Sequence, residues 1–204
     1  MEIDIIRTNL KYMLEMRGDD VSYIEEHGDA VVYDDVQRFY KELIILDTDK
    51  TTIFFALTKD ILKEKLLVKE MKKEDTAEAI FAKYKTKNFI VVTTESPSIK
   101  QSILQLQLID KVLQDAGGML QIFNVDELKY NPLTHRLVPK HRLISEAEEK
   151  VVMEKYKLKS KSQFPVISKS DIIGRWLGVR HGNVIEIERI NNNSGEYYYY
   201  RCAV

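Results

Sequence analysis

The sequence predicts an α/β domain over residues 1–130, followed by a small α+β domain over residues 131–204. The first domain is indicated by a strand–helix–strand spacing over residues 88–125, which is the pattern of a βαβ unit. The second is indicated by a hairpin over residues 184–203, where Asn-Asn-Asn-Ser-Gly separates two strand-like runs. The change of pattern places the boundary near Tyr130-Asn131-Pro132.

The first domain is expected to open with an amphipathic helix over residues 3–17. Its apolar side chains recur every three or four positions, at Ile3, Ile6, Leu10, Met13 and Leu14. Residues 18–36 are acidic and interrupted by glycine, which favours a loop with short helical turns. The apolar runs Leu43–Leu46 and Thr51–Leu57 flank the turn tetrapeptide Asp-Thr-Asp-Lys and predict a hairpin. Residues 60–86 carry apolar residues at helical spacing and predict one or two helices.

The βαβ unit begins with Asn88–Thr94, a β-branched run that predicts a buried strand. Ser96-Pro97 is a helix start, because serine can cap a free N–H and proline at the first helical position lacks one. The helix is expected to end at Gly117-Gly118, before a second strand over Met119–Val125. Two strands joined in this way predict a parallel pair with a right-handed crossover.

The second domain mixes short strands with short helices. Arg136–Leu143 predicts a strand interrupted by Pro139. Ser145-Glu146-Ala147-Glu148 has the sequence of a capping box and opens a helix. A second short helix is expected from Ser170-Asp171 to Gly178. In the last strand, Tyr197–Tyr200 place two tyrosines on each sheet face, which suits base stacking or the commoner cross-strand packing.

Charge and composition exclude several classes of protein. The chain is 44% hydrophobic and 31% charged with a net charge of -1, which excludes a disordered chain and a domain that is basic throughout. The charge is unevenly distributed, because residues 1–60 carry net -7, residues 61–130 net +1 and residues 131–204 net +5. The single cysteine, Cys202, predicts a reducing, intracellular setting. We expect no signal peptide and no membrane span.

Sequence motifs for chemistry are few. GxGxxG, GxxxxGK and GxSxG are all absent. His135 and His141 are expected on one face of a strand, in structural roles, and we expect no metal site. The alternative is a nuclease-like, Mg²⁺-dependent enzyme on the first domain, since such sites combine carboxylates with an acid-x-lysine tripeptide. Glu70-Met71-Lys72 and Glu148-Glu149-Lys150 match that tripeptide, but both fall on predicted helices.

A series of motifs in the second domain resembles one family. In order they are His135-Arg-Leu-Val-Pro-Lys-His141, Tyr156-Lys-Leu158, Gln163-Phe-Pro165, Asp171, Arg175-Trp-Leu-Gly178, Gly182, Val184, Ser194-Gly195 and Tyr200-Arg201. This order resembles the C-terminal domain of the fifth subunit of eukaryotic RNA polymerase II, shared by the nuclear polymerases, and the corresponding subunit of archaeal polymerases. In the first domain, Ile90-Val-Val92 with Pro97-Ser98-x-Lys100-Gln101 is similar to the eukaryotic members, while archaeal members lack this domain.

The resemblance implies a non-catalytic subunit of a DNA-directed RNA polymerase that needs no cofactor. The second domain would be an assembly domain that docks on the largest subunit among the other polymerase subunits, and the first domain would form part of the jaw beside downstream double-stranded DNA. The interface residues would be His135, Pro139, His141, Arg175, Trp176, Gly178 and Arg201; the DNA-facing loop would hold Ser96, Pro97, Ser98 and Lys100. Ser96–Ser98 suit a plain helix cap equally well, and Trp176 suits the core as well as an interface.

Two departures from the family pattern affect these expectations. Ile172 follows Asp171 where the family has proline, and Ser96 stands where the family usually has threonine. The divergent first domain suggests a copy encoded by a large DNA virus. The expected location is therefore intracellular: the nucleus for a cellular subunit, or the host cytoplasm and the virion for a viral one. The DNA contact would be weak and indirect, and no membrane partner is expected.

Overall fold

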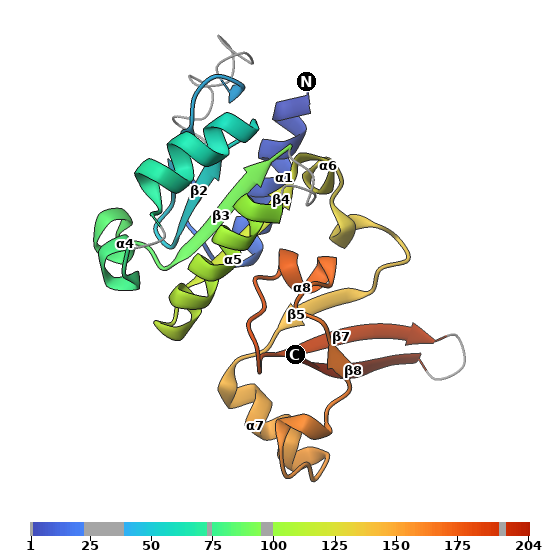
Figure 1. The fold of residues 1–204 in the computed structure, drawn as a ribbon. Coiled ribbons are helices and arrows are strands. Elements are labelled where there is room, and N and C mark those ends of the chain that lie inside the picture. Colours follow the sequence, from blue (N-terminus) through green and yellow to red (C-terminus); the bar gives the residue numbers. More distant parts are fainter. Residues whose placement is uncertain (1, 23–38, 73–74, 95–99, 192–194) are drawn as a thin grey trace. The chain divides into compact units, whose positions relative to one another are not determined.

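The structure is a computed structural model that describes residues 2–22, 39–72, 75–94, 100–191 and 195–204. The chain divides into two compact units, Met1–Tyr130 and Asn131–Val204 (Figure 1). Both units combine helices with a four-stranded sheet, so the chain is of the mixed α/β class.

The sheet of the first unit joins a hairpin to a βαβ unit. Its strands are β1 (Ile44–Asp47), β2 (Thr51–Phe55), β3 (Asn88–Thr93) and β4 (Met119–Asn124), in the order β1-β2-β3-β4. The predicted hairpin is confirmed by the antiparallel β1–β2 pair, and the predicted βαβ unit by the parallel β3–β4 pair. A parallel β2–β3 pair, which the sequence did not predict, merges the two into one sheet.

Helices precede and connect these strands. They are α1 (Glu2–Met16), the π-helix η1 (Ile61–Glu70), α4 (Ala77–Tyr84), α5 (Lys100–Asp115) and the short α6 (Val125–Leu128). The predicted N-terminal helix is therefore confirmed, and residues 60–86 form two helices. Most of the predicted acidic loop, and the predicted Ser96-Pro97 helix start, lie outside the described residues.

Helices cover both faces of this sheet, as parallel strands require. On one face, side chains from η1, α4 and α5 pack against Phe54, Phe89 and Val91. On the other, Arg17, directly after α1, donates to Gln121 of β4 over 2.7 Å, and the register partner of Gln121 is Ile90. Because neighbouring residues of a strand point to opposite faces, α1 lies on the face that Ile90 shares.

The turn from α5 into β4 depends on two glycines with different roles. Gly117 has a φ of 79°, in the left-handed region that glycine tolerates best. Gly118 donates its N–H to the Leu113 carbonyl over 2.7 Å and closes the helix end. A Cβ at Gly118 would lie 2.7 Å from the Phe81 ring and 2.8 Å from the Lys87 carbonyl, so the chain passes too closely here for any side chain. The predicted helix stop is thus confirmed.

The second unit has a sheet of order β5-β7-β8-β6. The strands are β5 (Lys140–Leu143), β6 (Val166–Ile167), β7 (Val184–Asn191) and β8 (Gly195–Ala203). The antiparallel β7–β8 pair confirms the predicted hairpin, and the short β6 joins β8 in parallel. In Figure 1 the strands β7 and β8 lie side by side, and β5 pairs with the other edge of β7.

Two helices cover opposite faces of this sheet. Helix α8 (Ile172–Trp176) contributes Ile173 to a cluster with Ile185 and Ile187 of β7. Helix α7 (Glu146–Lys155) contributes Val152 to a cluster on the other face, which includes Val184, Cys202, Ile144 and Phe164. The predicted capping box is present, because the Ser145 hydroxyl accepts from the Glu148 N–H and the Glu148 carboxylate accepts from the Ser145 N–H.

The predicted strand over Arg136–Leu143 is wrong in its first half. Only Lys140–Leu143 pair with β7, and His135 follows the short 3₁₀ helix Pro132–Thr134. Pro139 has no N–H for a ladder, and just before it the Val138 N–H donates to the His135 carbonyl in a turn. His135 and His141 therefore do not share a strand face.

Gly118→Ala should destabilise the first unit by about 2 kcal/mol, because the added methyl group meets a backbone carbonyl as well as a ring. We would measure hydrogen–deuterium exchange of peptides from β3 and β4, with β7 and β8 as the internal reference. Gly174→Ala is the matched control, since its Cβ would meet no atom closer than 3.5 Å. Equal protection of β3 and β4 in the two variants would contradict the expectation.

Candidate protein-binding surface

The sequence-predicted interface residues fall on two parts of the second unit. Pro139, His141 and Arg201 lie on or beside the sheet, whereas Arg175, Trp176 and Gly178 lie in α8 or just after it. His135 is separate, in an exposed turn where its Nδ1 accepts from the Leu137 N–H.

His141 is held in place by its own strand. Its Nδ1 lies 2.6 Å from the Pro139 carbonyl oxygen, so this nitrogen carries the proton and donates it. Partial burial lowers the pKa of His141, although the Pro139 hydrogen bond and nearby Asp171 act in the opposite direction. Arg189 and Arg201 add to the lowering. The imidazole is therefore mainly neutral at pH 7.

Those two arginines flank a tyrosine on the same face of the sheet. The guanidinium carbon of Arg189 lies 4.9 Å from the centre of the Tyr199 ring, and that of Arg201 lies 5.6 Å from it. Ile187 is the register partner of both Tyr199 and His141. Arg189, Arg201, Tyr199 and His141 therefore share one face of the sheet, which α8 covers in part. The sequence patterns pointed to the tyrosine run and to Arg201 but not to Arg189, because only the register of the hairpin brings Arg189 beside Tyr199.

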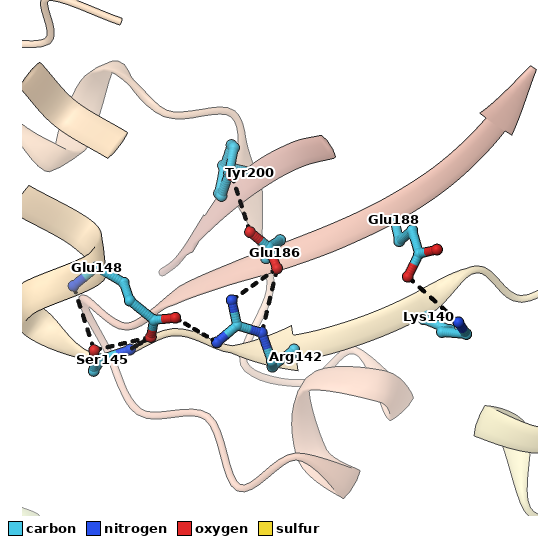
Figure 2. Close-up of polar contacts among 7 residues, drawn as sticks. All are labelled: Lys140, Arg142, Ser145, Glu148, Glu186, Glu188 and Tyr200. Atoms are coloured by element: carbon cyan, nitrogen blue, oxygen red, sulfur yellow. Dashed lines mark hydrogen bonds and ion pairs between the residues drawn. The ribbon is translucent and has the colours of Figure 1, made fainter. Parts of the chain in front are cut away.

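Four charged residues on the opposite face, Lys140, Arg142, Glu186 and Glu188, are paired within the chain, as Figure 2 shows. Arg142 contacts Glu148 over 2.7 Å and Glu186 over 2.8 Å, and the Tyr200 hydroxyl donates to Glu186 over 2.9 Å. Further along the same face, Lys140 pairs with Glu188 over 3.5 Å. Partial burial and the Glu186 hydrogen bond raise the pKa of Tyr200 to about 12. These contacts hold β5, β7, β8 and α7 together.

Helix α8 places the remaining predicted residues. The Asp171 carboxylate accepts from the N–H groups of Ile173 and Gly174, so the helix keeps an acidic cap without the family's proline. Arg175 is partly exposed, whereas Trp176 is 0% exposed and belongs to the core. Gly178 follows with a φ of 66°, which favours glycine.

The predicted DNA-facing residues are not on this surface. Ser96, Pro97 and Ser98 lie outside the described residues, and Lys100 begins α5 with its side chain outside them too. Among the residues that the structure describes, no group of three or more His, Cys, Asp or Glu side chains could hold a metal ion. No helix in this described part is long and apolar enough to cross a membrane.

The carboxylates of the two acid-x-lysine tripeptides serve structural contacts. Glu70, at the end of η1, accepts from Lys83 over 2.6 Å and from the Tyr84 hydroxyl over 2.5 Å, which ties η1 to α4. Glu148 belongs to the capping box, and the buried Glu149 pairs with Lys161 over 2.8 Å. Both tripeptides thus contribute to folding contacts between neighbouring elements.

The second unit defines the class of protein. Residues 130–203 match the family model described as "RNA polymerase Rpb5, C-terminal domain". The chain is therefore related to subunits of DNA-directed RNA polymerases.

Curated relatives extend the match beyond the second unit. "DNA-directed RNA polymerase subunit Rpo5" of Pyrococcus horikoshii is 45% identical over 76 residues, which are 37% of this chain and 92% of the relative. "DNA-directed RNA polymerases I, II, and III subunit rpabc1" of Dictyostelium discoideum is 31% identical over 159 residues, 77% of this chain and 73% of the relative. The Caenorhabditis elegans counterpart is 32% identical over 140 residues, 69% of this chain and 58% of the relative. The chain belongs to the family of RNA polymerase subunit 5.

Ser145→Ala should weaken the second unit at pH 7 and raise the pKa of Glu148 towards its ordinary value. The Ser145 N–H, Arg142 and the Ser145 hydroxyl lower the pKa of Glu148 from 4.5 to about 2. Because the folded value is the lower one, the carboxylate stabilises the fold above pH 4.5, and that contribution is lost as the pH falls towards 2. Losing the capping hydroxyl should cost about 1 kcal/mol at pH 7.

Urea unfolding at pH 7 and an NMR titration of the Glu148 side chain would measure the two effects. Ser162→Ala is the control, since that exposed hydroxyl bonds to the neighbouring Ser160 hydroxyl and caps no α-helix. An unchanged Glu148 pKa in the Ser145 variant would refute the assignment.

Proposed function

We propose that this chain is a non-catalytic subunit whose second unit, residues 131–204, docks on the largest subunit of a DNA-directed RNA polymerase. The observation that carries the proposal is the match of residues 130–203 to the polymerase-subunit family model. The partly exposed residues Arg175 and Arg201 and the exposed His135 are accessible enough to make such contacts. Trp176, being buried, would support the surface from beneath rather than touch the partner.

The first unit, residues 1–130, would form part of the polymerase jaw near downstream DNA. Support comes from the Dictyostelium relative, because a match of 159 residues is too long for the second unit alone and must include part of the first. The net charge of -7 over residues 1–60 argues against strong DNA binding by the isolated chain. The DNA contact would therefore be weak and indirect, made through Ser96, Pro97, Ser98 and Lys100 and maintained by the rest of the polymerase.

This role needs no cofactor and places the chain with the transcription machinery inside cells. For a cellular subunit of eukaryotic type, that location would be the nucleus. For a copy encoded by a large cytoplasmic DNA virus, it would be the host cytoplasm and the virion.

Affinity purification of the tagged full chain from its source cells tests the proposal. We expect the largest polymerase subunit and other polymerase subunits to be recovered with it. Their recovery should persist after a wash at high salt. Recovery of the chain alone, or with unrelated proteins, would refute the docking role. Incubation of the purified chain with duplex DNA and Mg²⁺ tests the nuclease alternative, which metal-dependent cleavage would support.

Arg175→Ala should weaken association with the polymerase about tenfold, because arginine is enriched among residues that dominate interface energy. The melting temperature should stay within about 2 °C of the unchanged chain, since the side chain is partly exposed. Recovery of the largest subunit in a pull-down measures association, with Lys169→Ala, an exposed cation just before α8, as the control. Equal recovery of the two variants would show that Arg175 is not an anchor.

Lys100→Ala should leave subunit association unchanged and reduce the contact with downstream DNA about twofold. Loss of one phosphate contact lowers the dependence of log affinity on log salt by about 1. Retention of downstream duplex by the assembled polymerase, measured over a range of salt, checks this. Lys111→Ala, later in α5, controls for the loss of charge. Reduced subunit association instead would place the start of α5 at a protein interface.

A further inference from the structure

The two faces of the β7–β8 hairpin differ in whether their positive charges form ion pairs. On the α7 face, Arg142 and Lys140 both pair with glutamates of β7. On the α8 face, Arg189 and Arg201 rest on the Tyr199 ring, and neither forms an ion pair with a carboxylate among the described residues. The α8 face thus carries two positive charges that the described part of the chain does not neutralise by pairing.

Arg201 also has a donor that the described part of the chain leaves unsatisfied. Its Nη1 donates to the Val166 carbonyl over 3.5 Å, but its Nε is buried and has no hydrogen-bond acceptor among the described residues. A buried donor without an acceptor costs free energy, so native structures almost always provide one. The buried Nε lies out of reach of a partner, which would instead meet the remaining N–H groups of this partly exposed residue.

The aromatic ring holds both guanidinium groups in place. Both guanidinium groups lie over the Tyr199 ring, and both arginine residues are partly exposed. Arginine in this arrangement suits an oxygen pair such as a carboxylate, which it binds through two parallel hydrogen bonds. Tyr197, the register partner of Arg189, is 38% exposed and extends the same face.

We propose that Arg189, Tyr199 and Arg201 form a binding site for an acidic polypeptide segment of a partner polymerase subunit. The proposal rests on the proposed docking function and names the chemistry of the partner. Two guanidinium groups suit one or two Asp or Glu side chains, whereas a nucleic-acid backbone requires a longer basic stripe. We name this set of three residues the arginine–tyrosine site.

The test compares tagged full-length variants recovered from source cells with their polymerase. Arg189→Gln combined with Arg201→Gln should reduce recovery of the largest subunit about tenfold or more, since removing arginines leaves the partner's carboxylates unpaired. Lys140→Gln, which removes one positive charge from the opposite face and is 86% exposed in its side chain, should change recovery less than twofold. Circular dichroism melting of each variant confirms folding. If the double variant does not fold, the Arg189→Lys and Arg201→Lys pair, which keeps the charge but loses the planar fork, should still reduce recovery severalfold.

A photo-reactive phenylalanine analogue in place of Tyr197 identifies the neighbour. We expect a cross-link to a polymerase-subunit peptide that contains Asp or Glu, lost in the double glutamine variant. Cross-linking to DNA would show a nucleic-acid site and overturn the proposal, as would a peptide without acidic residues or normal recovery of folded arginine variants. Failure of the unchanged chain to recover any polymerase would instead refute the proposed function, and the acidic-segment site with it.

Discussion

The pairing of β7 with β8 is the constraint on which the second unit depends. Its register runs from Val184 opposite Cys202 to Asn191 opposite Gly195, and β5 and β6 attach to its two edges. Because side chains alternate between the faces of a strand, a slip of one residue would move every one of them to the wrong side. The register therefore decides which residues face α7 and which face α8.

That alternation places paired charges on one face of the hairpin and the arginine–tyrosine site on the other. The α7 face brings Glu186 between Arg142 and the Tyr200 hydroxyl, so its polar groups neutralise one another and join three strands to a helix. The α8 face has an apolar cluster near the helix and the arginine–tyrosine site beside it. Exposed ion pairs contribute little to stability individually. The charges on the α7 face therefore stabilise the fold mainly because they form one network.

Local signals in the sequence predicted the parts, and non-local pairing decided how they combine. The Ser145–Glu148 box, the Gly117-Gly118 stop and both hairpins depend on residues close in sequence, and all are present. The parallel β2–β3 and β6–β8 pairs join distant segments with no turn signal between them. The prediction that His135 and His141 share a strand face was wrong, because the strand begins only after Pro139. Trp176 could be assigned to the core only once its burial was known.

The second unit has the physical means to fold without the first. Each face of its sheet has its own apolar cluster, with Ile185 on the α8 side and Val184 on the α7 side. The archaeal relative points the same way, because its 76 matched residues are 92% of its length and leave no room for a counterpart of the 130-residue first unit. The unequal charges of the chain follow this division, with net -7 over residues 1–60 and net +5 over residues 131–204. A near-zero total thus conceals two regions of opposite sign, and the positive one holds Arg189 and Arg201, which have no carboxylate partner in the described part of the chain.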